Sequence, residues 1–321
     1  MNENLLEVRN VTKIFDQRKS RRTVALKNVS FSMKKDVAST LAIVGESGSG
    51  KSTLANNILG FQVPTAGGIY YDSTDISKLN KMSHIRYRKE VQAIFQNPFE
   101  AFNPFYKIDH VFSTIIERFK LADSKKEAAA IVEKSIESVR LDPSGVLGKY
   151  SYQLSGGQLQ RIMFARTLLL QPRIMIADEP VSMIDASLRV TVLDIMVRLK
   201  KENDISQIYI THDLSTALQI SDDIIVMYKG CILEKGSAAE VIQSPKHPYT
   251  QLLISCIPLP SPDEKWTAPV KVNDIKNSNS MSDACCFCDK CPYTTEKCFE
   301  RTPMFIDINE GHSVACYLYS D

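Results

Sequence analysis

Apolar positions follow two different periods along this chain. Alternating apolar and polar residues in LLEVRNVTKIF (5–15) and VALKNVSFSM (24–33) predict two strands near the start. Short, mainly apolar runs at 41–44, 173–177, 207–211 and 224–228 predict buried strands. Helical spacing covers 51–60, most of 107–170, then 187–201 and 214–221, with SKKEAAAIVEKSIESVR as the clearest amphipathic segment. Strands that alternate with helices predict a mainly parallel sheet covered on both faces.

Composition divides the chain into a large domain and an appendage. Residues 257–284 shift to a polar, proline- and serine-containing stretch that is typical of a linker. We therefore expect an α/β domain over 1–257, with a helical part at about 97–170. A linker over 258–284 and a cysteine-rich segment over 285–321 would follow it.

The overall composition excludes several classes of protein. The hydrophobic content of 44% and the charged content of 24% are those of an ordinary globular protein, and the net charge of +2 argues neither for nor against nucleic acid, which we do not expect as a partner. No apolar run approaches the roughly 18 residues of a membrane-spanning helix, and the polar N-terminus lacks a secretion signal. We expect a cytosolic setting, where clustered cysteines bind metal more often than they form disulfides.

The segment GESGSGKST (45–53) carries the first chemical motif. Its glycines, placed between an apolar strand and a helix, allow the backbone N–H groups to surround phosphates. Lys51 would neutralise the β- and γ-phosphates, and the Ser52 hydroxyl would bind Mg²⁺. The candidate phosphate-binding residues are Gly45, Ser47, Gly48, Gly50, Lys51, Ser52 and Thr53.

A second motif, RIMIADEP (173–180), ends an apolar strand in two adjacent carboxylates. Asp178 can hold the Mg²⁺ shell while Glu179 polarises the attacking water. Together the two motifs predict a P-loop NTPase that binds a nucleoside triphosphate and Mg²⁺; the choice of ATP follows from the resemblance below.

The segment LSGGQ (154–158) is followed by a helical pattern, and here the sequence resembles the ATP-binding-cassette (ABC) family. The resemblance implies a RecA-like core with a mainly parallel sheet, an N-terminal antiparallel β subdomain, a helical signature subdomain and a small Cys-rich extension. It also implies that this segment closes on the nucleotide of a partner subunit. The residues that carry this role are Ser155, Gly156, Gly157 and Gln158.

Other family elements follow in the expected order. Gln96 matches the Q-loop glutamine, which contacts Mg²⁺ or water and couples the site to membrane subunits. Asp185 matches the D-loop aspartate, and His212 the switch histidine that contacts the γ-phosphate. Phe15 stands where the family stacks an aromatic ring on adenine, although a strand core residue would read the same way. The resemblance makes Glu179, His212 and Gln96 the catalytic candidates.

Three phrases resemble the oligopeptide/dipeptide/nickel importer branch: FQNPFEAFNPF, HPYTQLL and the C-terminal cysteine pattern. In that branch the cysteine segment is associated with an iron–sulfur cluster. The resemblance therefore favours a [4Fe–4S] cluster over zinc, and Cys286 and Cys288 are extra relative to its pattern. The ligands it implies are Cys285, Cys291, Cys298 and Cys316.

The expected function is ATP hydrolysis that drives an importer from the cytoplasmic face of the membrane. The implied partners are a second ATPase subunit, related but different, two permease subunits and an extracytoplasmic solute-binding protein. Peptides are the expected cargo, with nickel and oligosaccharides as alternatives within the branch. A soluble ABC ATPase of ribosomes or DNA would carry a second cassette or a long coiled coil, and neither is seen. The HPYT phrase and the cysteine segment argue against an exporter.

Overall fold

The computed structural model describes residues 3–17, 21–256 and 284–320. The chain forms two compact units, Met1–Lys78 with Tyr209–Asp321, and Leu79–Ile208. We call them unit 1 and unit 2. In the described part of the chain, no helix has both the length and the apolar character needed to cross a membrane.

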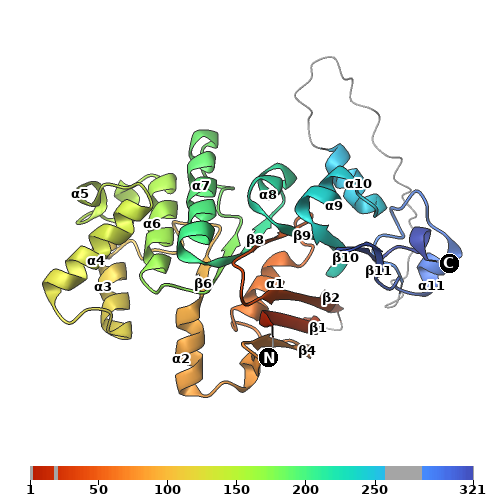
Figure 1. The fold of residues 1–321 in the computed structure, drawn as a ribbon, viewed down its shortest axis with the longest axis horizontal. Helices are drawn as coiled ribbons and strands as arrows, with labels where there is room; N and C mark the ends of the chain where they lie inside the picture. The colour runs from red at the N-terminus through yellow and green to blue at the C-terminus, as the bar shows by residue number, and fades with distance from the viewer. Residues whose placement is uncertain (1–2, 18–20, 257–283, 321) are drawn as a thin grey trace, which may run out of the picture. The chain divides into compact units, whose positions relative to one another are not determined.

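Unit 1 begins with an antiparallel sheet. The long strands β1 and β2 pair along most of their length, and β4 pairs with the other edge of β1 (Figure 1). Leu6, Val11, Leu26 and Val29 are fully buried in it, as the alternating pattern requires. Its strands are β1 (Asn4–Gln17), β2 (Arg21–Lys34), β4 (Ala66–Tyr71) and β5 (Thr74–Asp75).

A mixed set of strands forms the second layer of unit 1. Strand β3 pairs in parallel with β9, whereas β9–β10, β10–β12 and β12–β11 are antiparallel. A two-residue turn, Lys229-Gly230, joins β9 to β10, and both residues have positive φ, which a tight hairpin requires. The strands are β3 (Thr40–Val44), β9 (Asp223–Tyr228), β10 (Cys231–Ser237), β11 (Ile306–Asn309) and β12 (His312–Val314).

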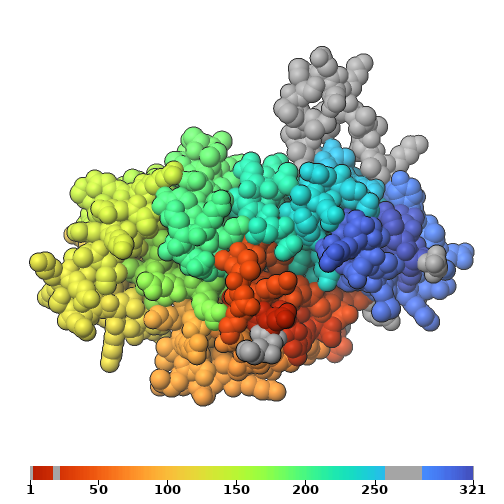
Figure 2. Space-filling view, viewed as in Figure 1, coloured from red at the N-terminus to blue at the C-terminus, as the bar shows by residue number. Residues whose placement is uncertain are grey.

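The helices of unit 1 are short, and the chain end packs on the same unit. In the space-filling view the C-terminal segment (blue) lies directly against the 231–255 region (cyan) (Figure 2). The two regions are joined by the antiparallel pairing of β12 with β10. The helices are α1 (Lys51–Ile58), α8 (Leu214–Ile220), α9 (Ala238–Gln243), α10 (Pro248–Ser255) and α11 (Glu296–Glu300), with short 3₁₀ turns η1 (Ile76–Lys78) and η3 (Tyr317–Tyr319).

Unit 2 combines a parallel strand pair with most of the long helices. Strands β6 (Val91–Ile94) and β7 (Ile174–Asp178) pair in register from Val91 with Ile174 to Ile94 with Ala177. The helices are α2 (Lys81–Glu90), α3 (Ile108–Phe119), α4 (Lys125–Ser138), α5 (Pro143–Val146), α6 (Gly156–Leu168) and α7 (Ala186–Asn203), with the 3₁₀ turn η2 (Ser151–Gln153). The boundary between the two units falls inside strand β8 (Ser206–Thr211), between Ile208 and Tyr209.

Most elements predicted from the apolar pattern are present. The runs at 41–44, 173–177, 207–211 and 224–228 correspond to β3, β7, β8 and β9. The expected mainly parallel sheet is a mixed one, because β10, β11 and β12 add antiparallel pairs. The predicted linker lies almost entirely outside the described residues, and the predicted domain boundaries stay a prediction.

Candidate functional site

The glycine loop of unit 1 runs from the end of β3 to the start of α1. Lys51, the first residue of α1, is only 5% exposed. Its ammonium group donates to the carbonyl oxygens of Gly45 (2.7 Å) and Glu46 (2.8 Å) and to Ser49 Oγ (3.4 Å). A buried ammonium beside a helix N-terminus is an environment that favours an anion.

At two positions of the loop, a neighbouring backbone carbonyl lies so close that only glycine fits. A Cβ at Gly45, where φ is +151°, would stand 2.1 Å from the Met227 carbonyl oxygen. A Cβ at Gly50, where φ is +100°, would stand 2.4 Å from the Ala25 carbonyl oxygen. Neighbouring strands therefore enforce the path of the loop.

Unit 2 brings the expected glutamine and glutamate together. Gln96 lies two residues beyond β6 and Glu179 one residue beyond β7, and these strands are parallel neighbours. Their carboxyl ends therefore meet at one edge. Gln96 Nε2 donates to Glu179 Oε2 at 2.8 Å. Asp178 ends β7 as a half-buried residue, and Glu179 has a φ of +46°, so the chain turns sharply at the carboxylate pair.

The LSGGQ segment caps helix α6 of the same unit. Ser155 Oγ accepts from the Gln158 N–H (3.2 Å), and Gln158 Oε1 accepts from the Ser155 N–H (2.9 Å). This reciprocal arrangement satisfies two N–H groups at the helix end. A Cβ at Gly157 would meet Leu188 Cδ1 at 2.5 Å, so a larger residue here would require the Leu188 side chain to shift. Asp185 precedes α7 and is exposed.

Two further expected site residues, His212 and Phe15, also lie in unit 1. His212 is exposed directly after β8, and Asp213 caps the following helix by accepting from the N–H groups of Ser215 and Thr216. Phe15 is 36% exposed near the end of β1, with the Lys13 ammonium 5.2 Å from its ring centre. A core role for Phe15 is therefore excluded, and its adenine-stacking role stays a prediction.

Comparison with known proteins matches these features to one family. An ABC transporter family model matches residues 26–182, and an oligopeptide/dipeptide transporter C-terminal region model matches residues 233–298. The chain is 37% identical to the oligopeptide transport ATP-binding protein AppF of Bacillus subtilis, over 99% of this chain and 98% of AppF. It is 36% identical to the dipeptide transport ATP-binding protein DppF of Haemophilus influenzae, over 93% and 90%. The chain belongs to the oligopeptide/dipeptide family of ABC transporter ATP-binding proteins.

A solved structure confirms the fold of this ABC subunit. The dimeric structure of the ATP-binding cassette MJ0796 bound to ADP and phosphate matches with a TM-score of 0.65 and 27% identity, covering 73% of this chain and 98% of that one. The predicted ABC ATPase fold, with its antiparallel N-terminal subdomain, is confirmed. The chain is an ATP-hydrolysing subunit of an ABC transport system.

The C-terminal segment of the ABC subunit gathers its thiols around one small cavity. Five buried cysteines line this cavity of about 40 Å³: Cys285, Cys288, Cys291, Cys298 and Cys316. Burial raises the pKa of Cys285 to about 12 and the pKa values of Cys288 and Cys316 to about 11. The four ligands predicted for a cluster therefore share a cavity, and Cys288 joins them. The C-x₂-C spacing of Cys288 and Cys291 was the signal that could have identified it.

Two features of this region differ from the expectation of a formed metal centre. Cys286 forms a disulfide with Cys231 of β10, whereas the cytosolic setting favoured free thiols. Among the described residues, no three or more cysteine, histidine or acidic side chains converge as a metal site. The comparisons support ATP and Mg²⁺ for this family and provide no support for an iron–sulfur cluster.

Proposed function

We propose that this subunit powers the import of peptides from the cytoplasmic face of the membrane, as one of two related but different ATPase chains. The names of AppF and DppF, which match over nearly the full length of this chain, support peptides as the cargo. The family further implies two permease subunits and an extracytoplasmic solute-binding protein as partners.

The glycine loop would bind the phosphates of ATP. Lys51 supplies the positive charge, and the backbone of Gly45, Ser47, Gly48, Gly50 and Thr53 supplies the surrounding surface. Ser52 is exposed at the second position of α1, where its hydroxyl can serve as a metal ligand, and the half-buried carboxylate of Asp178 in unit 2 is a second candidate ligand. Mg²⁺ bound there supplies charge neutralisation at the phosphates.

Glu179 would act as the general base that orients and deprotonates water. The observation that carries this role is the hydrogen bond from Gln96 Nε2 to Glu179 Oε2. This bond orients the carboxylate, and an oriented carboxylate beside the nucleotide phosphates is suited to accept a proton from water. Gln96 thereby connects the hydrolytic carboxylate to the exposed Q-loop that follows it, and His212 would contact the γ-phosphate.

The nucleotide site would be completed by a second chain. Ser155 is exposed at the N-terminus of α6, where the helix dipole favours negative charge. Together with Gly156, Gly157, Gln158 and Asp185 it would close on the nucleotide of the partner subunit. The dimeric MJ0796 structure, bound to ADP and phosphate, supports such an assembly.

Replacing Glu179 with glutamine tests the hydrolytic role. We expect Glu179→Gln to bind ATP as the unmodified protein does and to lose turnover by about 100-fold or more, the usual contribution of a general base. The matched control is Glu137→Gln, at an exposed position on α4 of the same unit, which should leave turnover unchanged. Turnover of Glu179→Gln within a few-fold of the original would remove Glu179 from this role.

The cargo is tested on the partner that binds it. Isothermal titration of the solute-binding protein encoded with this subunit, against a peptide mixture and against Ni²⁺, should show binding of peptides only. Binding of Ni²⁺ alone would assign the transporter to the nickel type.

We also propose that the cysteine cavity binds a metal centre, with an iron–sulfur cluster first and zinc second. The support is the donor set: buried thiols on one cavity are the ligands that both centres require. Binding would have to draw the side chains together, because they do not converge in the described structure. Iron, sulfide and zinc measured after anaerobic purification decide between the centres, and a metal-free preparation with full stability would contradict both.

A further inference from the structure

A residue of the HPYT segment (247–250) forms a hydrogen bond with the backbone of the phosphate-binding loop. The backbone N–H of Glu46 donates to the hydroxyl oxygen of Tyr249 at 3.0 Å. Tyr249 lies in the first turn of α10 and is completely buried. The hydroxyl group of a residue more than 200 positions after Glu46 is therefore in direct contact with the loop backbone.

The bond fixes one particular peptide unit. The peptide that contributes the Glu46 N–H also contributes the Gly45 carbonyl, and this carbonyl accepts from Lys51 Nζ at 2.7 Å. Tyr249 thus holds one end of the peptide and Lys51 the other. The hydrogen bond to Tyr249 therefore opposes rotation of this peptide. Its orientation determines where the Lys51 ammonium is held.

The hydroxyl of Tyr249 is suited to this contact. Burial raises the pKa of Tyr249, so the group stays neutral across the working range of pH. A packing role alone would be met by phenylalanine, since the ring already contacts other rings. The hydroxyl places a polar atom in the core, and the loop amide satisfies it.

The cysteine-rich segment supports Tyr249 from the other side. Phe287, between Cys286 and Cys288, is 2% exposed. Its ring centre lies 5.4 Å from that of Tyr249 and 5.3 Å from that of Tyr228, and Tyr228 lies 4.6 Å from Tyr249. These are the distances of favourable aromatic pairs. The three rings therefore form one cluster, to which the C-terminal segment contributes a member.

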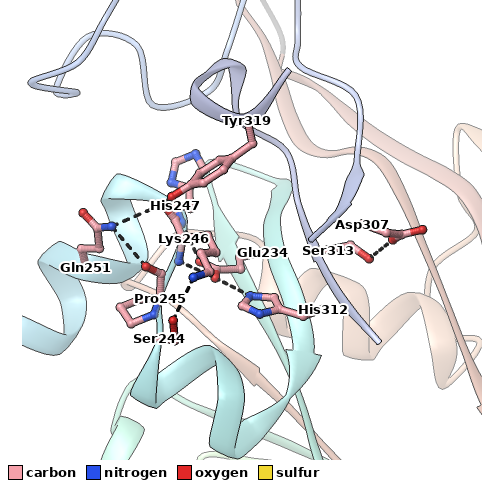
Figure 3. A network of polar contacts seen from close by, with 10 residues as sticks. All are labelled: Glu234, Ser244, Pro245, Lys246, His247, Gln251, Asp307, His312, Ser313 and Tyr319. Carbon is pink, nitrogen blue, oxygen red and sulfur yellow. Dashed lines mark hydrogen bonds and ion pairs between the residues drawn. The ribbon is translucent and has the colours of Figure 1, made fainter. Parts of the chain in front are cut away.

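A buried carboxylate makes a second connection between the segment and Tyr249. Glu234, which is 0% exposed, accepts from His312 Nε2 (2.8 Å) and from the N–H groups of Lys246 (2.8 Å) and His247 (2.9 Å) (Figure 3). His247 Nδ1 in turn accepts from the Tyr249 N–H at 3.0 Å. The backbone of Tyr249 is thus tied, through His247 and Glu234, to His312 of the C-terminal segment.

We infer that Tyr249 is a positioning residue for the phosphate-binding loop, and that the cysteine-rich segment holds Tyr249 in place through Phe287. Nucleotide affinity therefore depends on the packing of a segment that contributes no residue to the loop. The inference rests on the proposed role of Lys51 in binding phosphates.

The decisive variant is Tyr249→Phe, which keeps the ring and removes only the hydroxyl. We expect its affinity for a fluorescent ATP analogue to fall about 3- to 10-fold, the range for one lost hydrogen bond. The matched control is Tyr317→Phe, which removes a hydroxyl that donates to the Arg301 carbonyl oxygen and does not contact the loop. Its affinity should be unchanged. Equal affinities for the Tyr249→Phe variant and the original protein would overturn the inference.

A double-mutant cycle separates positioning of Lys51 from general stability. If Tyr249 acts through Lys51, Tyr249→Phe should have little further effect on affinity in a Lys51→Ala background. A full additional loss in that background would overturn the positioning role. Normal ATP affinity of Lys51→Ala alone would instead contradict the proposed function of the loop, so the two failures are distinct.

The contribution of the cysteine-rich segment is tested by Phe287→Leu. We expect weaker ATP binding by a factor similar to that of Tyr249→Phe, and a smaller-than-additive effect in the double variant. Phe305→Leu is the control, because Phe305 belongs to the same segment, is 42% exposed and lies against Lys235. Unchanged affinity of folded Phe287→Leu would remove the segment from the inference. Should Phe287→Leu fail to fold, Phe287→Met, which removes the ring but keeps a long apolar side chain, replaces it with the same expected direction.

Discussion

At the scale of single residues, Gly45 has the least freedom of the glycines in the phosphate-binding loop. Its φ of +151° disfavours any residue with a side chain, and a Cβ at this position would also stand 2.1 Å from the Met227 carbonyl oxygen. A backbone carbonyl of a central strand cannot move aside as a side chain can. Substitution must therefore displace either β9 or the loop.

Gly45→Ala should lower the free energy of unfolding by about 3 kcal/mol and abolish ATP binding. The matched control is Gly60→Ala, which has a φ of +72° and nothing within 4 Å of the added Cβ. It measures the cost of positive φ alone, about 1 kcal/mol, and should leave ATP binding intact. Urea denaturation of both variants gives the comparison, and equal losses would show that the contact with Met227 is relieved at no cost.

The sequence predicts site residues where their chemistry is local. The glycines, Lys51 and the Asp178-Glu179 pair stand in contiguous motifs, because a phosphate loop and a strand end are built from neighbours in sequence. Tyr249 could not be found in this way. Its partner, the Glu46 N–H, belongs to the backbone and has no signature in the sequence.

At the scale of elements, the capped N-terminus of α6 has both a structural and a proposed functional role. Ser155 accepts from an N–H group three residues ahead, and so does Ser124 at the start of α4, both at 3.2 Å. The two serines therefore stabilise their helices in the same way. Only Ser155 belongs to the segment proposed to contact a partner's nucleotide.

Ser155→Ala and Ser124→Ala should each lower the free energy of unfolding by about 1 kcal/mol, the cost of losing a serine cap. ATP turnover should be lost only in Ser155→Ala. Thermal unfolding and phosphate release, measured on both variants in parallel, separate stability from function. Equal turnover in the two would confine Ser155 to a capping role.

The helices and central strands were predictable because their apolar periods are set by local burial. The pairing of β10 with β12 was not. It joins Glu234 and Lys235 to residues about 80 positions later, on a strand of only three residues. Such a short segment has no periodicity of its own, and its register depends on the buried contact between His312 and Glu234.

At the scale of the whole molecule, the eight cysteines fall into three chemical environments. Cys231 and Cys286 form a disulfide, Cys256 is exposed, and five thiols line the buried cavity. In the metal-free chain, to which the following labelling experiment refers, burial raises the pKa values of Cys285, Cys288, Cys291 and Cys316, so these thiols hold their protons at neutral pH. Alkylation requires the thiolate and access, and the cavity limits both.

Iodoacetamide should therefore label the native chain once at pH 8, at Cys256. At a pKa of about 11, as for Cys288 and Cys316, only on the order of one thiol in a thousand is ionised at that pH. The reaction of the cavity thiols should accelerate as pH rises, because more thiolate forms.

Denaturation before labelling should give six labels, and reduction followed by denaturation eight, counted by mass spectrometry of the intact chain. Eight labels without reductant would show that Cys231 and Cys286 are free. Rapid labelling of cavity thiols in the native chain would show that the C-terminal segment opens, and with it the ring cluster that supports Tyr249.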